Sequence, residues 1–153
     1  MNMIYRQLSD YCNKKFGCFL TINPQRFKDK HPSNNASLLE FNVTKPIIVS
    51  KEPDSVQVIW SILHEIGHLF VRRYTYIDKY KRNIAIWSLK GFRESSKTEK
   101  IICGFNLWMD ELLAWIFAYF LTYKFKIKRK GFIKHANYCI STYYQFIVNG
   151  IKE

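Results

Sequence analysis

Two segments of this chain repeat apolar residues at the spacing of a buried α-helix. Residues 56–70 place apolar side chains three and four positions apart, and residues 106–123 are apolar almost throughout. Because an α-helix completes a turn every 3.6 residues, this spacing gathers the apolar side chains on one broad face. The pattern predicts two core helices, and Lys51–Ser55, with a proline and two acidic residues, predicts the start of the first.

Shorter patterns predict the other elements and the fold class. A glycine closes the first amphipathic segment, and short apolar runs bounded by turn residues are typical of strands. We expect one α+β domain over residues 1–153, mainly helical, with a short antiparallel sheet beside the helix at 56–70. The other expected elements are helices over 4–16 and 132–148 and strands over 18–22, 38–43 and 46–50, the last two paired antiparallel.

The composition suits a small protein with a core of its own. Of 153 residues, 48% are hydrophobic, which is enough to bury a core without disulfides. The four cysteines form no C-x-x-C pair and the first residues show no signal-peptide pattern, so we expect reduced thiols and a cytoplasmic protein. The longest apolar run, residues 112–123, is shorter than a membrane span, so we expect no membrane role.

The candidate chemistry is concentrated in the segment His64-Glu65-Ile66-Gly67-His68. Residues four apart on a helix share one face, so both imidazoles can reach a single tetrahedral zinc ion. Glu65 then stands beside the open coordination position, where a general base for water is needed. Gly67 costs about 1 kcal/mol relative to alanine in a helix, so we expect another backbone or the substrate to pass close to it. The motif predicts zinc-dependent hydrolysis of an amide bond.

A catalytic zinc site needs a third protein ligand, and three glutamates are candidates. Glu111 begins a stripe of the helix at 106–123 that continues with two alanines, small residues that let this helix approach the one carrying the histidines. Glu94 and Glu99 lie in segment 93–100, which has no apolar period and predicts a polar loop. We therefore favour Glu111, with Glu94 and Glu99 as rivals.

Three features together resemble the ImmA/IrrE-like zinc metallopeptidases, members of the gluzincin group: the strand at 46–50, the His-Glu-x-Gly-His helix and the segment Glu111-x-x-Ala114-x-x-Phe117-Ala118. The likeness spans roughly residues 40–121. The 43 positions from His68 to Glu111 are more than that family leads us to expect. The resemblance implies a zincin-like fold and Zn²⁺ as the cofactor, with His64, His68 and Glu111 as ligands and Glu65 as the general base.

Peptidases of this architecture bind an extended substrate as an extra strand at a free sheet edge beside the metal. We expect the strand at 46–50 to provide that edge through Ile47, Ile48 and Val49. If the final helix folds back over the site, His135 and a nearby tyrosine such as Tyr138 are candidates for the donor to the developing oxyanion. For His135, a surface position after a basic loop is the alternative.

Two further polar residues are candidates for the site. Asp110 is placed to orient a ligating histidine through its second ring nitrogen, or to be exposed beside Glu111. His31 stands in a polar loop and is a weaker candidate.

The net charge of +12 raises the question of an anionic partner. Residues 124–134 interleave Lys and Arg with Phe and Ile, a pattern that suits a phosphate backbone and equally a solvated surface. The family resemblance implies a protein substrate, with a DNA-binding transcriptional repressor as the expected type. The alternatives are a catalytically silent metal-site protein that sequesters a protein or nucleic-acid partner, and a small DNA-binding module. Metal content and turnover distinguish among the three.

Overall fold

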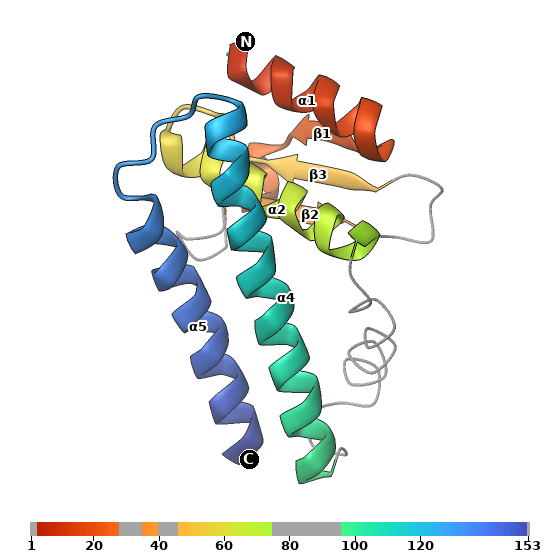
Figure 1. Ribbon diagram of the computed structural model, residues 1–153, viewed down its shortest axis with the longest axis vertical. Helices are drawn as coiled ribbons and strands as arrows, with labels where there is room; N and C mark the ends of the chain where they lie inside the picture. The colour runs from red at the N-terminus through yellow and green to blue at the C-terminus, as the bar shows by residue number, and fades with distance from the viewer. Residues whose placement is uncertain (1–2, 28–34, 40–45, 75–95, 153) are drawn as a thin grey trace.

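The computed structural model describes residues 3–27, 35–39, 46–74 and 96–152. A small sheet packs with helices α1 and α2, and two long antiparallel helices, α4 and α5, run side by side and extend beyond the sheet (Figure 1). The chain is α+β and mainly helical, as the sequence predicts. In chain order the elements are α1 (Met3–Phe16), β1 (Phe19–Ile22), a 3-10 turn (Pro24–Phe27), β2 (Ala36–Leu39), β3 (Ile47–Ser50), α2 (Val56–Tyr74), α4 (Lys97–Lys124) and α5 (Phe132–Lys152).

The three described strands form a mixed sheet in the order β1-β3-β2. β2 pairs antiparallel with β3, which confirms the predicted pairing at Leu38 and Leu39. The strand begins two residues earlier than predicted, at Ala36, and residues 40–43 of the predicted strand lie outside the described residues. β1 pairs parallel with β3, so the expectation of a purely antiparallel sheet was wrong. β3 therefore lies in the centre of the described sheet.

The central place of β3 overturns one prediction about the site. Ile47, Ile48 and Val49 were expected to offer a free edge, but both sides of β3 are paired. The side chains agree, because Ile48, Val49 and Ser50 are all buried. A continuous apolar run is typical of a strand covered on both faces, and it says nothing about which edge is free. The outer strands of the described sheet are β1 and β2.

Two helices begin at places that differ from the prediction. α2 begins at Val56, and Ser55 caps it, because its Oγ accepts a hydrogen bond from the N–H of Val58 at 3.4 Å. α4 begins at Lys97, within the segment predicted to be a polar loop. Ser96 and Glu99 form a reciprocal capping box there, and an exposed first turn has no apolar period to reveal it.

α2 and α4 approach each other closely at Gly67. A Cβ built on this glycine would lie 2.2 Å from the backbone oxygen of Ala114 and less than 3 Å from two further backbone atoms of that residue. The sequence-based expectation of a close backbone is therefore confirmed. Ala114 and Ala118 are fully buried on the same side of α4. Small residues on both helices thus allow the contact that brings Glu111 of α4 to the histidines of α2.

We expect Gly67→Ala to separate α2 from α4 and to weaken metal binding together with stability. The added methyl group meets backbone that cannot rotate away, so the free energy of unfolding should fall by about 1 to 3 kcal/mol. Chemical denaturation and zinc titration measure the two effects. Gly104→Ala is the matched control, because the atom it meets first is the side-chain Cγ2 of Ile147, at 2.4 Å. Equal losses in both variants would contradict a special role for the Gly67 contact.

By length and composition, α4 is the one described helix that could cross a membrane. Its most apolar stretch is 39% buried inside the protein. The core helix of a soluble protein passes the same test, so this finding assigns no compartment.

Candidate metal centre

Three side chains that could hold a metal ion converge where α2 crosses α4. His64 and His68 come from successive turns of α2, and Glu111 comes from α4. The Nε2 atoms of the two histidines lie 3.1 Å apart, and the carboxylate oxygens of Glu111 lie 3.1 Å from Nε2 of His64 and 3.4 Å from Nε2 of His68. The structure thus brings together the three residues that the sequence predicts as ligands.

The spacing of these atoms fits a tetrahedral ion. Ligand atoms about 2.0 to 2.1 Å from a tetrahedral zinc lie about 3.3 Å from one another, close to the separations between these three side chains. All three are buried, with exposed fractions of 7% for His64, 8% for His68 and 4% for Glu111. Two imidazole nitrogens and a carboxylate facing one another away from water need a cation or protons between them. The group is therefore chemically suited to a metal ion.

Asp110 supports this arrangement from behind His68. Its Oδ2 lies 3.2 Å from Nδ1 of His68, the ring nitrogen that faces away from Glu111. A carboxylate there keeps the proton on Nδ1 and leaves the Nε2 lone pair for a metal. Asp110 is itself buried. Of the two positions that the sequence left open for Asp110, the structure shows the one beside the histidine.

Hydrogen bonds among these side chains shift their pKa values toward the charged forms. Burial alone would lower the pKa of His68, but hydrogen bonds to Asp110 and Glu111 outweigh it and raise this pKa to about 10. Burial alone would raise the pKa of Glu111, but hydrogen bonds to His64 and His68 and their charge hold it well below its ordinary value. Glu111 is therefore a carboxylate at neutral pH, and a metal ion must displace the proton on His68.

Aromatic and backbone contacts fix the other groups of α2. The ring of Trp115 stacks on that of His64, with centroids 4.3 Å apart and planes inclined by 22°. Glu65 lines a cavity beside the ligands, and its Oε2 accepts a hydrogen bond from the N–H of Leu38 in β2 at 2.9 Å. The three ligand side chains and Glu65 are thus held by different parts of the fold. This leaves Glu65 beside the ligand group without being part of it.

A cavity of about 70 Å³ opens next to the ligand group. Its wall includes Tyr143 of α5, a residue outside the predicted site. Tyr143 is 38% exposed, but desolvation, the charges of Glu111 and Glu65 and a hydrogen bond with Glu111 all raise its pKa, so its hydroxyl stays protonated. The residues lining the cavity are Asn35, Ala36, Ser61, His64, Glu65, Glu111, Trp115, Cys139, Thr142 and Tyr143.

The two residues predicted to face the reacting carbonyl do not line this cavity. His135 packs between the rings of Trp60 and Trp115, each 5.6 Å away, and its Nε2 lies 3.8 Å from Sγ of Cys139. Burial and the neighbouring His64 lower the pKa of His135. Tyr138 is 51% exposed. α5 does fold back over the site, but another turn of the helix faces it.

A sequence signal for Tyr143 exists in retrospect. His135, Cys139 and Tyr143 recur every four residues, so they share one face of α5. Cys139 and Tyr143 line the cavity and His135 does not, which depends on how α5 packs against α4. Spacing alone therefore does not single out Tyr143.

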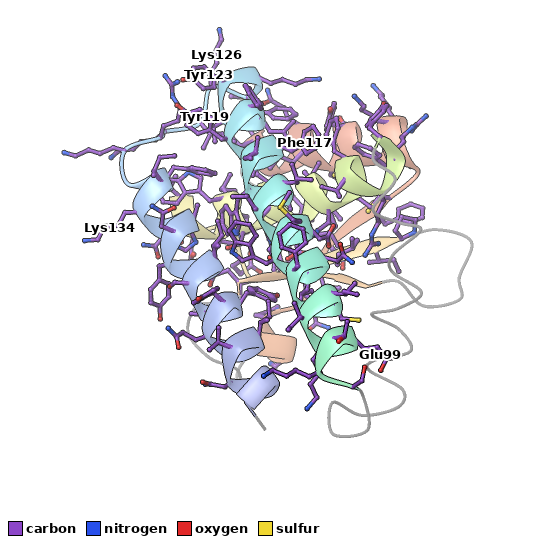
Figure 2. All side chains as sticks on the ribbon, turned by 60° about the horizontal axis from the view of Figure 1, so that its bottom comes forward. Glu99, Phe117, Tyr119, Tyr123, Lys126 and Lys134 are labelled. Atoms are coloured by element: carbon purple, nitrogen blue, oxygen red, sulfur yellow. The ribbon has the colours of Figure 1, made fainter. Side chains whose placement is uncertain are left out.

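The rival third ligands take no part in the described site. Glu99 accepts hydrogen bonds from the N–H and the hydroxyl of Ser96, which places it in the cap of α4. It lies at the opposite end of α4 from Tyr123 and Lys126 (Figure 2). Glu94 and His31 lie outside the described residues. Among described residues, Glu111 is the glutamate that completes the group of ligands.

We expect Asp110→Asn to lower zinc affinity about 10- to 100-fold while keeping the fold. An amide can present its NH₂ group instead of an acceptor to Nδ1 of His68, and even as an acceptor it orients and polarises the ligand ring less strongly than a carboxylate does. Competition with a chromophoric chelator measures the affinity. Asp54→Asn, on the exposed segment before α2, is the matched control. Unchanged affinity in Asp110→Asn would show that the contact with His68 is incidental.

No protein-family model, curated protein sequence or solved structure matches this chain. The residues themselves therefore carry the argument about function. What they show is a buried group of two histidines and one glutamate that could hold a metal ion, in a small α+β protein.

Proposed function

We propose that this protein is a zinc-dependent metallopeptidase with a zincin-like site, as its resemblance to the ImmA/IrrE-like enzymes implies. The observation that supports this most directly is the convergence of His64, His68 and Glu111, with Glu65 beside them on the cavity wall. Two histidines and one carboxylate leave a fourth position for water, which is the ligand set of catalytic zinc in peptidases. A structural zinc site would instead close all four positions.

The proposed chemistry divides between the metal and Glu65. Zinc bound by the three ligands would acidify a water molecule and polarise the carbonyl of the bond to be cleaved. Glu65 takes the proton from that water and passes it to the leaving amine. The hydrogen bond from Leu38 N–H holds one oxygen of this carboxylate on the cavity side. Its carboxylate is thus restrained before the substrate enters, which lowers the entropic cost of the reaction.

We propose β2, rather than β3, as the strand on which an extended substrate docks. Lys51 N–H donates to the carbonyl of Asn35, so Asn35 faces β3, and the next residue in an antiparallel strand turns its polar backbone groups the other way. Ala36 and Leu38 therefore direct theirs to the outer side, where the N–H of Leu38 is already bonded to Glu65, so the backbone groups of Ala36 are the ones proposed to pair with a substrate. Ala36 also lines the cavity. An added peptide strand at this edge would pass beside the metal.

Tyr143 is the proposed donor to the oxyanion. A protonated phenol on the cavity wall can donate a hydrogen bond to negative charge that develops on the carbonyl oxygen. We expect Tyr143→Phe to lower kcat about 10²- to 10³-fold with KM and zinc content little changed. Steady-state kinetics and metal analysis measure these quantities. Tyr138→Phe is the matched control on the same helix, and an equal loss there would contradict the assignment.

The test of the proposed function uses a library of extended peptides and mass spectrometry. Zinc-loaded protein should cleave a subset of peptides, chelation should stop the cleavage, and added zinc should restore it. The resemblance suggests a transcriptional regulator as the natural substrate, so co-expression with DNA-binding repressors is the second assay. Intact peptides and intact repressors with zinc bound would favour the alternative, a catalytically silent protein that sequesters its partner.

A further inference from the structure

Eight positions on the outward side of α4, between Ile102 and Tyr123, carry only apolar side chains over about six turns. At 3.6 residues per turn these positions fall within an arc of about 100°, opposite the alanines that pack on α2. Five of the eight are exposed, and Phe120 is the most exposed at 63%. An exposed apolar face of this length marks an interaction surface. The residues are Ile102, Phe105, Met109, Leu112, Leu113, Ile116, Phe120 and Tyr123.

The C-terminal end of this face meets a cluster of positive charge. Residues 124–134 contain six Lys and Arg residues, all exposed, and residues 112–152 contain no Asp or Glu. The guanidinium carbon of Arg129 lies 3.7 Å from the ring centroid of Tyr123, which joins the charges to the apolar face. Figure 2 shows Tyr123 and Lys126 at this end of α4, with Lys134 on the neighbouring α5. Ile133, next to Lys134 at the start of α5, is also exposed.

We propose that this corner of the molecule docks on the surface of an anionic lipid bilayer. The lipid-facing corner comprises Ile116, Phe120, Tyr123 and Ile133 with the cations of residues 124–134. Anionic headgroups would neutralise the cations, and the acyl boundary would take up the Ile and Phe side chains. Tyr123 suits the interface because its ring is apolar and its hydroxyl is polar.

Other occupants match only part of this surface. A phosphodiester backbone would pair with the cations and leave Ile116, Phe120 and Ile133 in water. A second copy of the chain would bring six cations against six more across a two-fold axis. The expectation of no membrane role came from the length of one apolar run, which argues against spanning a bilayer and does not bear on lying on its surface. The proposal does not depend on the metal centre.

Co-sedimentation of the full chain with vesicles tests the proposal. We expect binding to phosphatidylcholine vesicles that contain about a quarter phosphatidylglycerol, little binding to phosphatidylcholine alone, and weakening as salt is raised. The paired change Lys128→Glu with Lys130→Glu should lower the partition coefficient at least about tenfold. The paired change Ile116→Ser with Phe120→Ser should lower it by a similar factor, because both side chains are already exposed and the fold does not need them.

The controls alter similar groups elsewhere. Met3→Ser with Tyr138→Ser removes exposed apolar side chains from α1 and α5, and Lys97→Glu changes charge at the far end of α4. These variants should bind vesicles like wild type, and circular dichroism should be the same for all. Absence of binding to anionic vesicles would overturn the proposal, as would binding that survives both paired changes. Salt-dependent binding of a DNA oligonucleotide without vesicle binding would assign the corner to nucleic acid instead.

Discussion

Glu65→Gln should abolish peptide cleavage and leave zinc binding intact. The glutamine amide oxygen can still accept the hydrogen bond from Leu38 N–H, so the side chain should keep its place on the cavity wall. It cannot take a proton from water, and loss of a general base typically costs about 10² to 10⁴ in rate. The cleavage rate in the peptide assay and the zinc content of the purified variant are the two measurements.

The control for this prediction is a glutamate that lies away from the site. Glu99→Gln alters the cap of α4 and should cleave peptides at the wild-type rate. A zinc-loaded Glu65→Gln protein that still cleaves would refute Glu65 as the base. If the wild-type protein cleaves no peptide, and the Glu65→Gln variant has the same effect in cells as wild type, the protein acts by sequestering its partner.

Glu111→Ala should remove zinc from the protein. Removing a residue that only hydrogen-bonds to a metal ligand typically lowers metal affinity about 10- to 100-fold. Glu111→Ala should lower zinc affinity by more than this, because it removes a ligand itself. The change also removes the carboxylate that contacts the two buried histidines. Breaking a buried charge pair costs about 3 to 5 kcal/mol of stability. Glu111→Gln keeps the volume of the side chain, so this variant distinguishes the loss of metal from the loss of the fold. Metal analysis and thermal unfolding measure the two effects.

The rival glutamates provide the comparison for this prediction. Glu99→Ala and Glu94→Ala should each retain zinc at the wild-type level. If either of these changes empties the site while Glu111→Ala does not, the assignment of the third ligand is wrong. Removing zinc from the wild-type protein with a chelator should give the same zinc-free behaviour as Glu111→Ala, while the carboxylate of Glu111 stays in place.

The geometry of the ligand group was largely predictable because it depends on local spacing. The residues of the motif lie four positions apart on one helix, and 3.6 residues per turn places both imidazoles on one side whatever the rest of the fold does. The stripe of Glu111 with two alanines belongs to a second helix of the same kind. The glycine in the motif indicated that a neighbouring backbone passes close, and Ala114 provides it.

Other predictions failed where a weak local signal was outweighed or missed. The segment with Glu99 was predicted to be a polar loop, because the first turn of α4 is exposed. Only the capping pair of Ser96 and Glu99 indicates that a helix begins there. Tyr138 and Tyr143 both follow the basic segment. Their sequence context is similar, yet one is half exposed and the other lines the cavity.

The sequence by itself determined the two core helices and the shared face of His64 and His68, since both follow from periodicity within single helices. That Glu111 meets these histidines depends on how α4 packs on α2. Only the tertiary structure decided that β3 is central and β2 is the outer strand beside Glu65, because strand order depends on pairing between distant segments. It also decided that Asp110 meets His68 and that Tyr143 faces the cavity. These contacts depend on how α2, α4 and α5 pack together, and side-chain spacing along one helix carries no information about its neighbours.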